Sequence, residues 1–184
     1  VVVRTTGAEL EFLPAAGALH LRQRLGRQRE AAVVQFPEGV LTGLSVVRRG
    51  SGAVLLSAGG GRLQMRINGD SLLMLKTEEP LRLSYRLGFA PASVRQFMAD
   101  YLLLDEWGGI GSYVAAGGPG VGAMSEDGLV TYQLPAGCVF WLAVAPPRPY
   151  DWEASFRDRV VWHWSMQTGY PSDAEIEQWA RYGN

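Results

Sequence analysis

The stretch Asp105-Glu106-Trp107-Gly108-Gly109 is the sharpest local candidate for a functional site. Carboxylates accept hydrogen bonds from sugar hydroxyls, and an indole ring can stack on the face of a sugar. Asp105 and Glu106 are neighbours, so on a strand they point in opposite directions, which argues against the carboxyl pair that glycosidic hydrolysis needs. These two acids and Trp107 are therefore candidates for carbohydrate binding. The alternative, which the pattern favours, is a strand-end turn with a packed Trp.

Three further residues are candidates for contact with carbohydrate. Tyr113 and Trp152 can offer rings for stacking, and His163 alternates with two Trp residues on an expected strand. The two histidines of the chain lie far apart without carboxylates at ligand spacing, so no metal site is predicted. The sequence has no G-x-S-x-G motif, and the Gly-rich segment 115–124 lacks the Lys-Ser/Thr of a phosphate-binding loop. We predict no catalytic residue and no cofactor.

The composition excludes several classes of protein. The 17 basic and 18 acidic residues of this 184-residue chain give a net charge of −1, so nothing favours nucleic acid or an anionic membrane as partner. No apolar run approaches the roughly 20 residues of a spanning helix. The single cysteine, Cys138, lies in an apolar run and is predicted to be a buried, unreactive thiol. The start, VVVRTT, is not a signal peptide and lacks an initiator Met, so no compartment is predicted.

Alternation of apolar and polar residues dominates the first 145 residues. In segment 81–89, Leu81, Leu83 and Tyr85 share one face, and Arg82 and Ser84 share the other. Further runs are apolar on both faces, as central strands are, and Gly-rich or Asn-Gly turn signals separate them. Many short strands without a long amphipathic helix predict an all-β fold, an antiparallel β-sandwich over 1–145. Segment 89–98 is expected to form a short helical turn.

The pattern changes over residues 146–184. A Pro-rich connector leads to an expected strand at 160–166 and then to a helix that starts after Ser172. Ser172 and Glu175 have the spacing of a capping box, and Ile176 and Trp179 share one side of the helix. A strand followed by a helix is typical of the opening of a β/α unit. The alternative is a C-terminal helix that packs on the sandwich.

Three stretches carry a resemblance to a known arrangement: LLLDEWGGIGSY, FWLAVAPPRPYDW and YPSDAEIEQWARYGN. Together they resemble the N-terminal part of large glycoside-hydrolase-like proteins, in which a galactose-mutarotase-like β-sandwich (supersandwich) precedes a (β/α)8 barrel. The resemblance implies that residues 146–184 are the crossover and the first β/α unit of the barrel. It carries over no catalytic residue, because the carboxylates of such barrels normally lie on later strands.

Three functions follow as hypotheses. The first is a non-catalytic ancillary sandwich of a glycoside hydrolase, which predicts an apolar surface around Trp162, Trp164, Ile176 and Trp179. The second is a stand-alone carbohydrate-binding module or lectin, which predicts a row of exposed rings elsewhere. The third is a structural or assembly sandwich without a ligand, which predicts a symmetric self-contact. A mutarotase-type enzyme is less favoured, because its chemistry needs His and carboxylate groups in one cleft and the chain has only two His. The first is preferred, with carbohydrate and a following (β/α)8 domain as partners.

Overall fold

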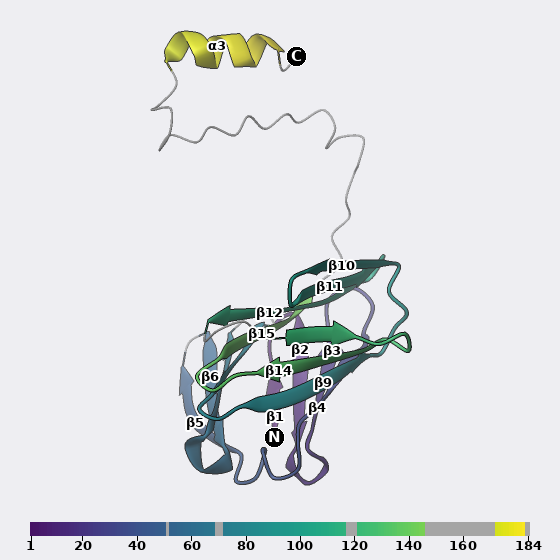
Figure 1. The fold of residues 1–184 in the computed structure, drawn as a ribbon, viewed down its shortest axis with the longest axis vertical. Helices are drawn as coiled ribbons and strands as arrows, with labels where there is room; N and C mark the ends of the chain where they lie inside the picture. The colour runs from purple at the N-terminus through teal and green to yellow at the C-terminus, as the bar shows by residue number, and fades with distance from the viewer. Residues whose placement is uncertain (51, 69–71, 117–120, 146–171, 183–184) are drawn as a thin grey trace. The chain divides into compact units, whose positions relative to one another are not determined.

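The computed structural model describes residues 1–50, 52–68, 72–116, 121–145 and 172–182 (Figure 1). The chain divides into two units, Val1–Arg148 and Pro149–Asn184. Two antiparallel sheets pack together in the first unit, and the prediction of an all-β sandwich is confirmed. The expected connector, the expected strand at 160–166, Trp152 and His163 lie outside the described residues.

One sheet has seven strands. Each strand pairs antiparallel with its neighbours, and the sheet is bounded by the first strand of the chain and by a short strand from its second half. In spatial order the strands are β1 (Val2–Arg4), β2 (Ala8–Leu13), β3 (Ala18–Gln23), β4 (Arg29–Gln35), β9 (Leu81–Leu87), β14 (Leu129–Leu134) and β13 (Val121–Met124).

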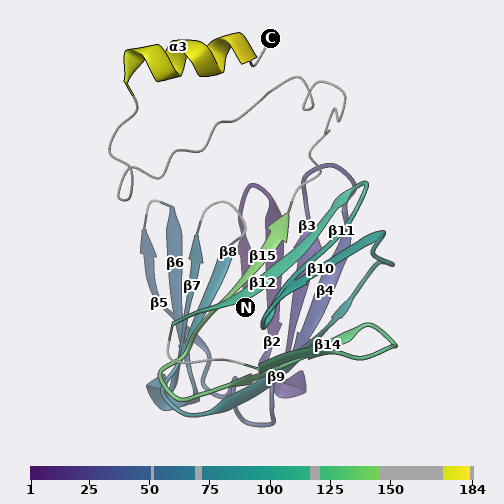
Figure 2. The same cartoon turned by 45° about the horizontal axis from the view of Figure 1, so that its top comes forward.

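The other sheet has eight strands, all antiparallel. Figure 2 shows four of them, β5 to β8, side by side as consecutive hairpin-connected strands. In spatial order the strands are β10 (Ser93–Phe97), β11 (Asp100–Asp105), β12 (Gly108–Ala116), β15 (Val139–Ala145), β8 (Leu72–Thr77), β7 (Leu63–Asn68), β6 (Ala53–Ala58) and β5 (Ser45–Gly50).

Helical structure is limited. Two 3-10 turns, η1 (Pro14–Ala16) and η2 (Gly59–Gly61), connect strands, and α3 (Asp173–Tyr182) is the helix expected near the C-terminus. The capping box is present: the Ser172 hydroxyl accepts from the Glu175 amide at 3.3 Å, and the Glu175 carboxylate accepts from the Ser172 amide at 2.8 Å. No helix within the described ranges has the length and apolar character needed to cross a membrane.

The core lies between the two sheets and follows the period of two. In β9, Leu81, Leu83 and Tyr85 are buried, whereas Arg82 and Arg86 are exposed. The prediction for segment 89–98 was wrong, because residues 93–97 form β10. Five cross-strand partners in β11 hold this segment extended, and local sequence does not report such pairing.

Cys138 also lies in the core, as the sequence predicts. The residue is 1% exposed, and this burial raises the pKa of its thiol. Because the thiolate is the reactive form, a buried thiol with a raised pKa is unreactive at neutral pH.

Three hydroxyl groups form a hydrogen-bonded network inside this core. The Ser112 hydroxyl, from β12, lies 2.8 Å from the Tyr85 hydroxyl and 2.8 Å from the Tyr132 hydroxyl. Both tyrosines come from the seven-stranded sheet, and both are fully buried. Burial raises the pKa of both phenols, an effect that their hydrogen bonds with Ser112 only partly offset.

Candidate functional site

Asp105, at the end of β11, takes part in an ion pair that joins the two sheets. Its Oδ2 and Oδ1 atoms accept from Nη1 and Nη2 of Arg29 at 2.5 and 2.8 Å, and Oδ1 also accepts from the Trp107 amide at 2.8 Å. The Arg29 and Asp105 side chains are only 12% and 15% exposed. The hydrogen bonds from Arg29 lower the pKa of the Asp105 carboxyl, although burial acts in the opposite direction. The carboxylate is therefore ionised and already bonded.

The turn after Asp105 is fixed from the opposite sheet. The buried Gln23 side chain donates to the carbonyl oxygens of Trp107 at 2.5 Å and of Leu25 at 2.7 Å. Its own carbonyl accepts from Nε of Arg29 at 3.2 Å. This turn therefore has the hydrogen bonding of a structural junction between sheets.

The other two residues of the acidic turn point outward. Glu106 is exposed, and Trp107 is 39% exposed with the Arg27 guanidinium 6.0 Å from its ring centroid. Trp107 can contact a ligand from this position. The Asp105 carboxylate cannot contact a ligand in the same way, because Arg29 already binds it.

We expect Asp105→Ala to lower the free energy of unfolding by about 3 kcal/mol, because it leaves the Arg29 charge without its partner in a partly buried place. Urea unfolding followed by tryptophan fluorescence measures this. The matched control is Glu79→Ala, which breaks the exposed ion pair with Arg62 and should cost less than about 1 kcal/mol. Equal effects of the two changes would contradict a junction at Asp105.

Tyr113 and Trp141 form a stacked pair on the outer face of the eight-stranded sheet. They are cross-strand partners on β12 and β15, with ring centroids 5.7 Å apart and planes 3° apart. Tyr113 is 42% exposed, and Trp141 is half-buried. The indole N–H of Trp141 is buried and has no acceptor among the described residues. Trp141 thus supports one side of the Tyr113 ring and fixes its orientation.

A cleft of about 450 Å³, here called the aromatic cleft, lies beside this pair. Gly111 and Ala143, which are cross-strand partners, form its floor. Because both side chains are minimal, the sheet surface is hollow between Leu102 on one side and the two rings on the other. The full lining is Arg95, Gln96, Asp100, Tyr101, Leu102, Gly111, Ser112, Tyr113, Trp141 and Ala143.

Polar side chains of the β10–β11 hairpin form the rim of the aromatic cleft. Asp100 accepts from the Val114 amide at 3.1 Å, and Gln96 donates to the Met98 carbonyl at 3.0 Å. Arg95 is exposed and forms no ion pair with any described residue. Met98, 81% exposed at the hairpin tip, has a φ of 55°, the one positive φ among the described non-glycine residues.

The structure does not bring the sequence candidates together. Tyr113 lies five positions after Gly108 along β12, about 17 Å at 3.3–3.4 Å per residue, so Trp107 and Tyr113 do not share a cleft. The sequence missed Trp141, whose segment appears apolar on both faces and therefore typical of the core. Trp141 lies beside Tyr113 because β15 pairs with β12, and the two residues are 28 positions apart in the sequence. No local sequence pattern indicates such a pairing.

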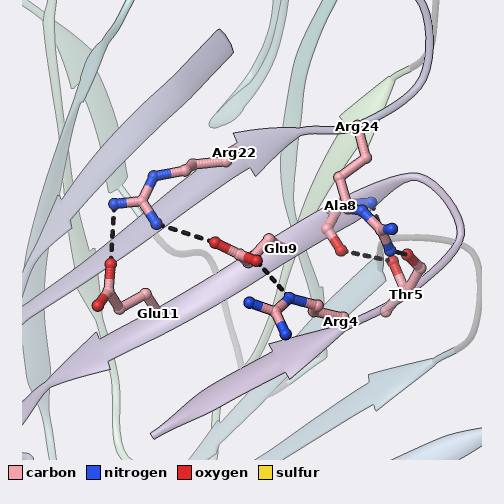
Figure 3. Close-up of polar contacts among 7 residues, drawn as sticks. All are labelled: Arg4, Thr5, Ala8, Glu9, Glu11, Arg22 and Arg24. Carbon is pink, nitrogen blue, oxygen red and sulfur yellow. Dashed lines mark hydrogen bonds and ion pairs between the residues drawn. The ribbon is translucent and has the colours of Figure 1, made fainter. Parts of the chain in front are cut away.

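The outer face of the seven-stranded sheet has a different character. Figure 3 shows Glu9 accepting from Arg4 at 2.6 Å and from Arg22 at 2.9 Å, while Arg22 also pairs with Glu11 at 2.8 Å. These hydrogen bonds from Arg4 and Arg22 lower the pKa of the Glu9 carboxyl. Arg4 and Arg22 on this face are thus neutralised by carboxylates across the strands.

His20 belongs to the same face and lies 2.6 Å from the Glu30 carboxylate through Nδ1, with its side chain 26% exposed. Within the described residues, no three His, Cys, Asp or Glu side chains gather as metal ligands do.

No protein-family model matches the chain, and no curated protein matches it significantly by sequence. The aromatic cleft and its surroundings are therefore the basis for assigning a function.

Proposed function

We propose that the chain is a non-catalytic ancillary β-sandwich region of a larger glycoside-hydrolase-like protein, and that it contacts carbohydrate at the aromatic cleft. The observation that carries this proposal is the stacked Tyr113–Trp141 pair beside a hollow of about 450 Å³ with a polar rim. In this proposal, residues 146–184 lead into a following (β/α)8 domain of the same polypeptide, as the resemblance of the sequence implies.

The cleft suits a sugar because a sugar ring has an apolar C–H face and an edge of hydroxyl groups. Tyr113 offers a ring surface that Trp141 holds in place, and such preorganisation lowers the entropic cost of binding. Gly111 has no side chain and Ala143 has only a methyl group, so a sugar ring can lie close to the sheet here. At the rim, Arg95 can donate to hydroxyl oxygens and Asp100 can accept from hydroxyl groups.

Two further observations support an ancillary rather than a catalytic role. The best-placed acid of the sequence, Asp105, is held by Arg29, so it is not available as one of the two carboxyls that hydrolysis needs. In α3, Ile176 is 49% exposed on a helix whose first turn is capped by Ser172. An exposed isoleucine on a capped helix fits a segment that packs against further structure.

The test is binding of an oligosaccharide panel, neutral and acidic, followed by calorimetry and by tryptophan fluorescence. Tyr113→Ala removes the exposed ring, and Gly111→Val fills the floor of the cleft. A Cβ at Gly111 would meet only the Leu102 Cδ1 atom, at 3.7 Å, so the strand can accept this residue. We expect each change to weaken binding about tenfold or more, which is about 1.4 kcal/mol.

Trp107→Ala is the matched control, because it removes another exposed ring at the far end of the same hairpin. We expect it to change the affinity less than about twofold, well under 1.4 kcal/mol. Loss of binding in Trp107→Ala but not in Tyr113→Ala would move the site to the acidic turn. Failure of every oligosaccharide to bind the unmodified chain would overturn the proposed function.

A further inference from the structure

We propose that the ligand of this sheet face is an anionic glycan chain, one with uronate carboxylates, which runs across the eight-stranded sheet. The inference rests on the proposed function and adds the chemical class and the extent of the ligand. Its evidence is a second cleft in line with the first and an excess of unpaired cations around both.

The second cleft has a volume of about 350 Å³ and adjoins the first. Trp141 lines the aromatic cleft, Met74 lines the second cleft, and these two residues are direct cross-strand partners on β15 and β8. The second cleft continues over β7 and β6 to Val47 of β5, which is 66% exposed.

The two clefts together span most of the sheet. Leu102 on β11 and Val47 on β5 are six strand positions apart, which is about 29 Å at roughly 4.8 Å per strand. A single sugar ring occupies a small part of this length. The face therefore fits an extended chain of several rings that crosses the strands.

Cations line both clefts without neutralising partners. Arg95 lies at the rim of the aromatic cleft, and Arg66 and Lys76 line the second cleft. Arg66 uses Nε to donate to the Asn68 side chain, and none of the three cations pairs with a described carboxylate. Asp100 is the one acidic residue in the lining of these two clefts.

The cations of the opposite sheet provide a comparison for the excess of unpaired cations at the two clefts. On the seven-stranded sheet, Arg4, Arg22 and Arg86 are paired with carboxylates, and Arg82 forms no ion pair with a described residue. Most cations of that sheet are thus neutralised, whereas the three cations at the two clefts are not. A guanidinium matches a carboxylate in a two-point hydrogen-bonded geometry. Apolar clefts with separated cations at their edges therefore complement a chain of sugar rings that carries regularly spaced carboxylates.

The experiment compares oligogalacturonate with its methyl-esterified form at the same chain length, using the whole chain at 50 and 200 mM salt. Esterification removes the charges and keeps the rings. We expect the acidic form to bind at least tenfold more tightly at 50 mM salt, and we expect this advantage to shrink at 200 mM, where charges are more strongly screened. Arg66→Gln should weaken binding of the acidic form about fivefold and leave the ester unchanged.

Arg82→Gln is the matched control, since it removes the same charge from an exposed residue of the opposite sheet. If ester and acid bind equally and both depend on Tyr113, the proposed function stands and the anionic ligand is wrong. If neither binds, the proposed function itself fails. If oligo-dT binds as tightly as the acidic glycan or more tightly, the partner is a nucleic acid and the inference is overturned. If sedimentation shows a dimer with Val47 in its interface, the partner is a second copy of the chain and the inference is likewise overturned.

Discussion

Replacement of Gly109 by Ala should lower the free energy of unfolding by about 3 kcal/mol, the upper end of what overpacking costs. An ideal Cβ at Gly109 lies 2.0 Å from the carbonyl oxygen of Leu103 and 2.9 Å from Cα of Leu104. Both atoms belong to the backbone of the paired strand β11, so no side chain can move aside. Strands β11 and β12 would have to separate where Asp105 joins the two sheets.

Gly111 provides the control within the same strand. Its Cβ would make only an ordinary contact with a Leu102 methyl group at 3.7 Å, and its φ is not positive. Gly111→Ala should therefore stabilise the sandwich by about 0.5–1 kcal/mol, because glycine loses more conformational entropy on folding than alanine. Urea unfolding of both variants measures the difference. If the two variants had similar free energies of unfolding, the close approach of the β11 backbone to Gly109 would be contradicted.

The sandwich should also lose stability steeply above pH 10, through Tyr85 and Tyr132. Burial raises the pKa of both phenols in the folded protein, whereas tyrosine in an unfolded chain ionises near pH 10. Above that pH the unfolded chain releases two protons that the folded protein keeps. Because the unfolded state then binds fewer protons, the free energy of unfolding falls as pH rises, by about 2.7 kcal/mol per pH unit.

Chemical unfolding at intervals from pH 8 to 12 measures this slope, in a Cys138→Ala background that removes the buried thiol from the titration. Tyr132→Phe should reduce the slope by about half, to about 1.4 kcal/mol per pH unit, because one of the two phenols is gone. Tyr113→Phe, which removes an exposed hydroxyl outside the network, should keep the full slope. A stability that stays constant to pH 12 would contradict the buried network.

Much of the sandwich follows from local patterns in the sequence. The alternation in segment 81–87 places Leu83 and Tyr85 in the core, and the apolar surroundings of Cys138 place the thiol there. The capping box of α3 is equally local, because Ser172 and Glu175 are three residues apart. Each of these predictions depends only on neighbours in the chain, and the physics of strands and helix ends acts at that range.

The candidate site depends on distant pairing, and here the sequence was insufficient. Asp105 appears as a free acid after a strand, and only the fold shows that Arg29, 76 residues earlier, holds it. Trp141 appears as a core residue, and only the sheet order shows its ring beside Tyr113. Residues 93–97 appear helical in isolation, and the partner strand β11 makes them extended. Long-range pairing decides all three.

The strand order also governs how the polypeptide acquires its structure. The chain passes between the two sheets five times within the described residues, and β15 enters between β8 and β12 only at residues 139–145. Until that strand is available, β8 and β12 each lack one neighbour and the eight-stranded sheet remains in two parts. We therefore expect the eight-stranded sheet to be completed only once residues 139–145 are present, and the dominance of non-local pairings is typical of slow-folding topologies, on the millisecond-to-second scale.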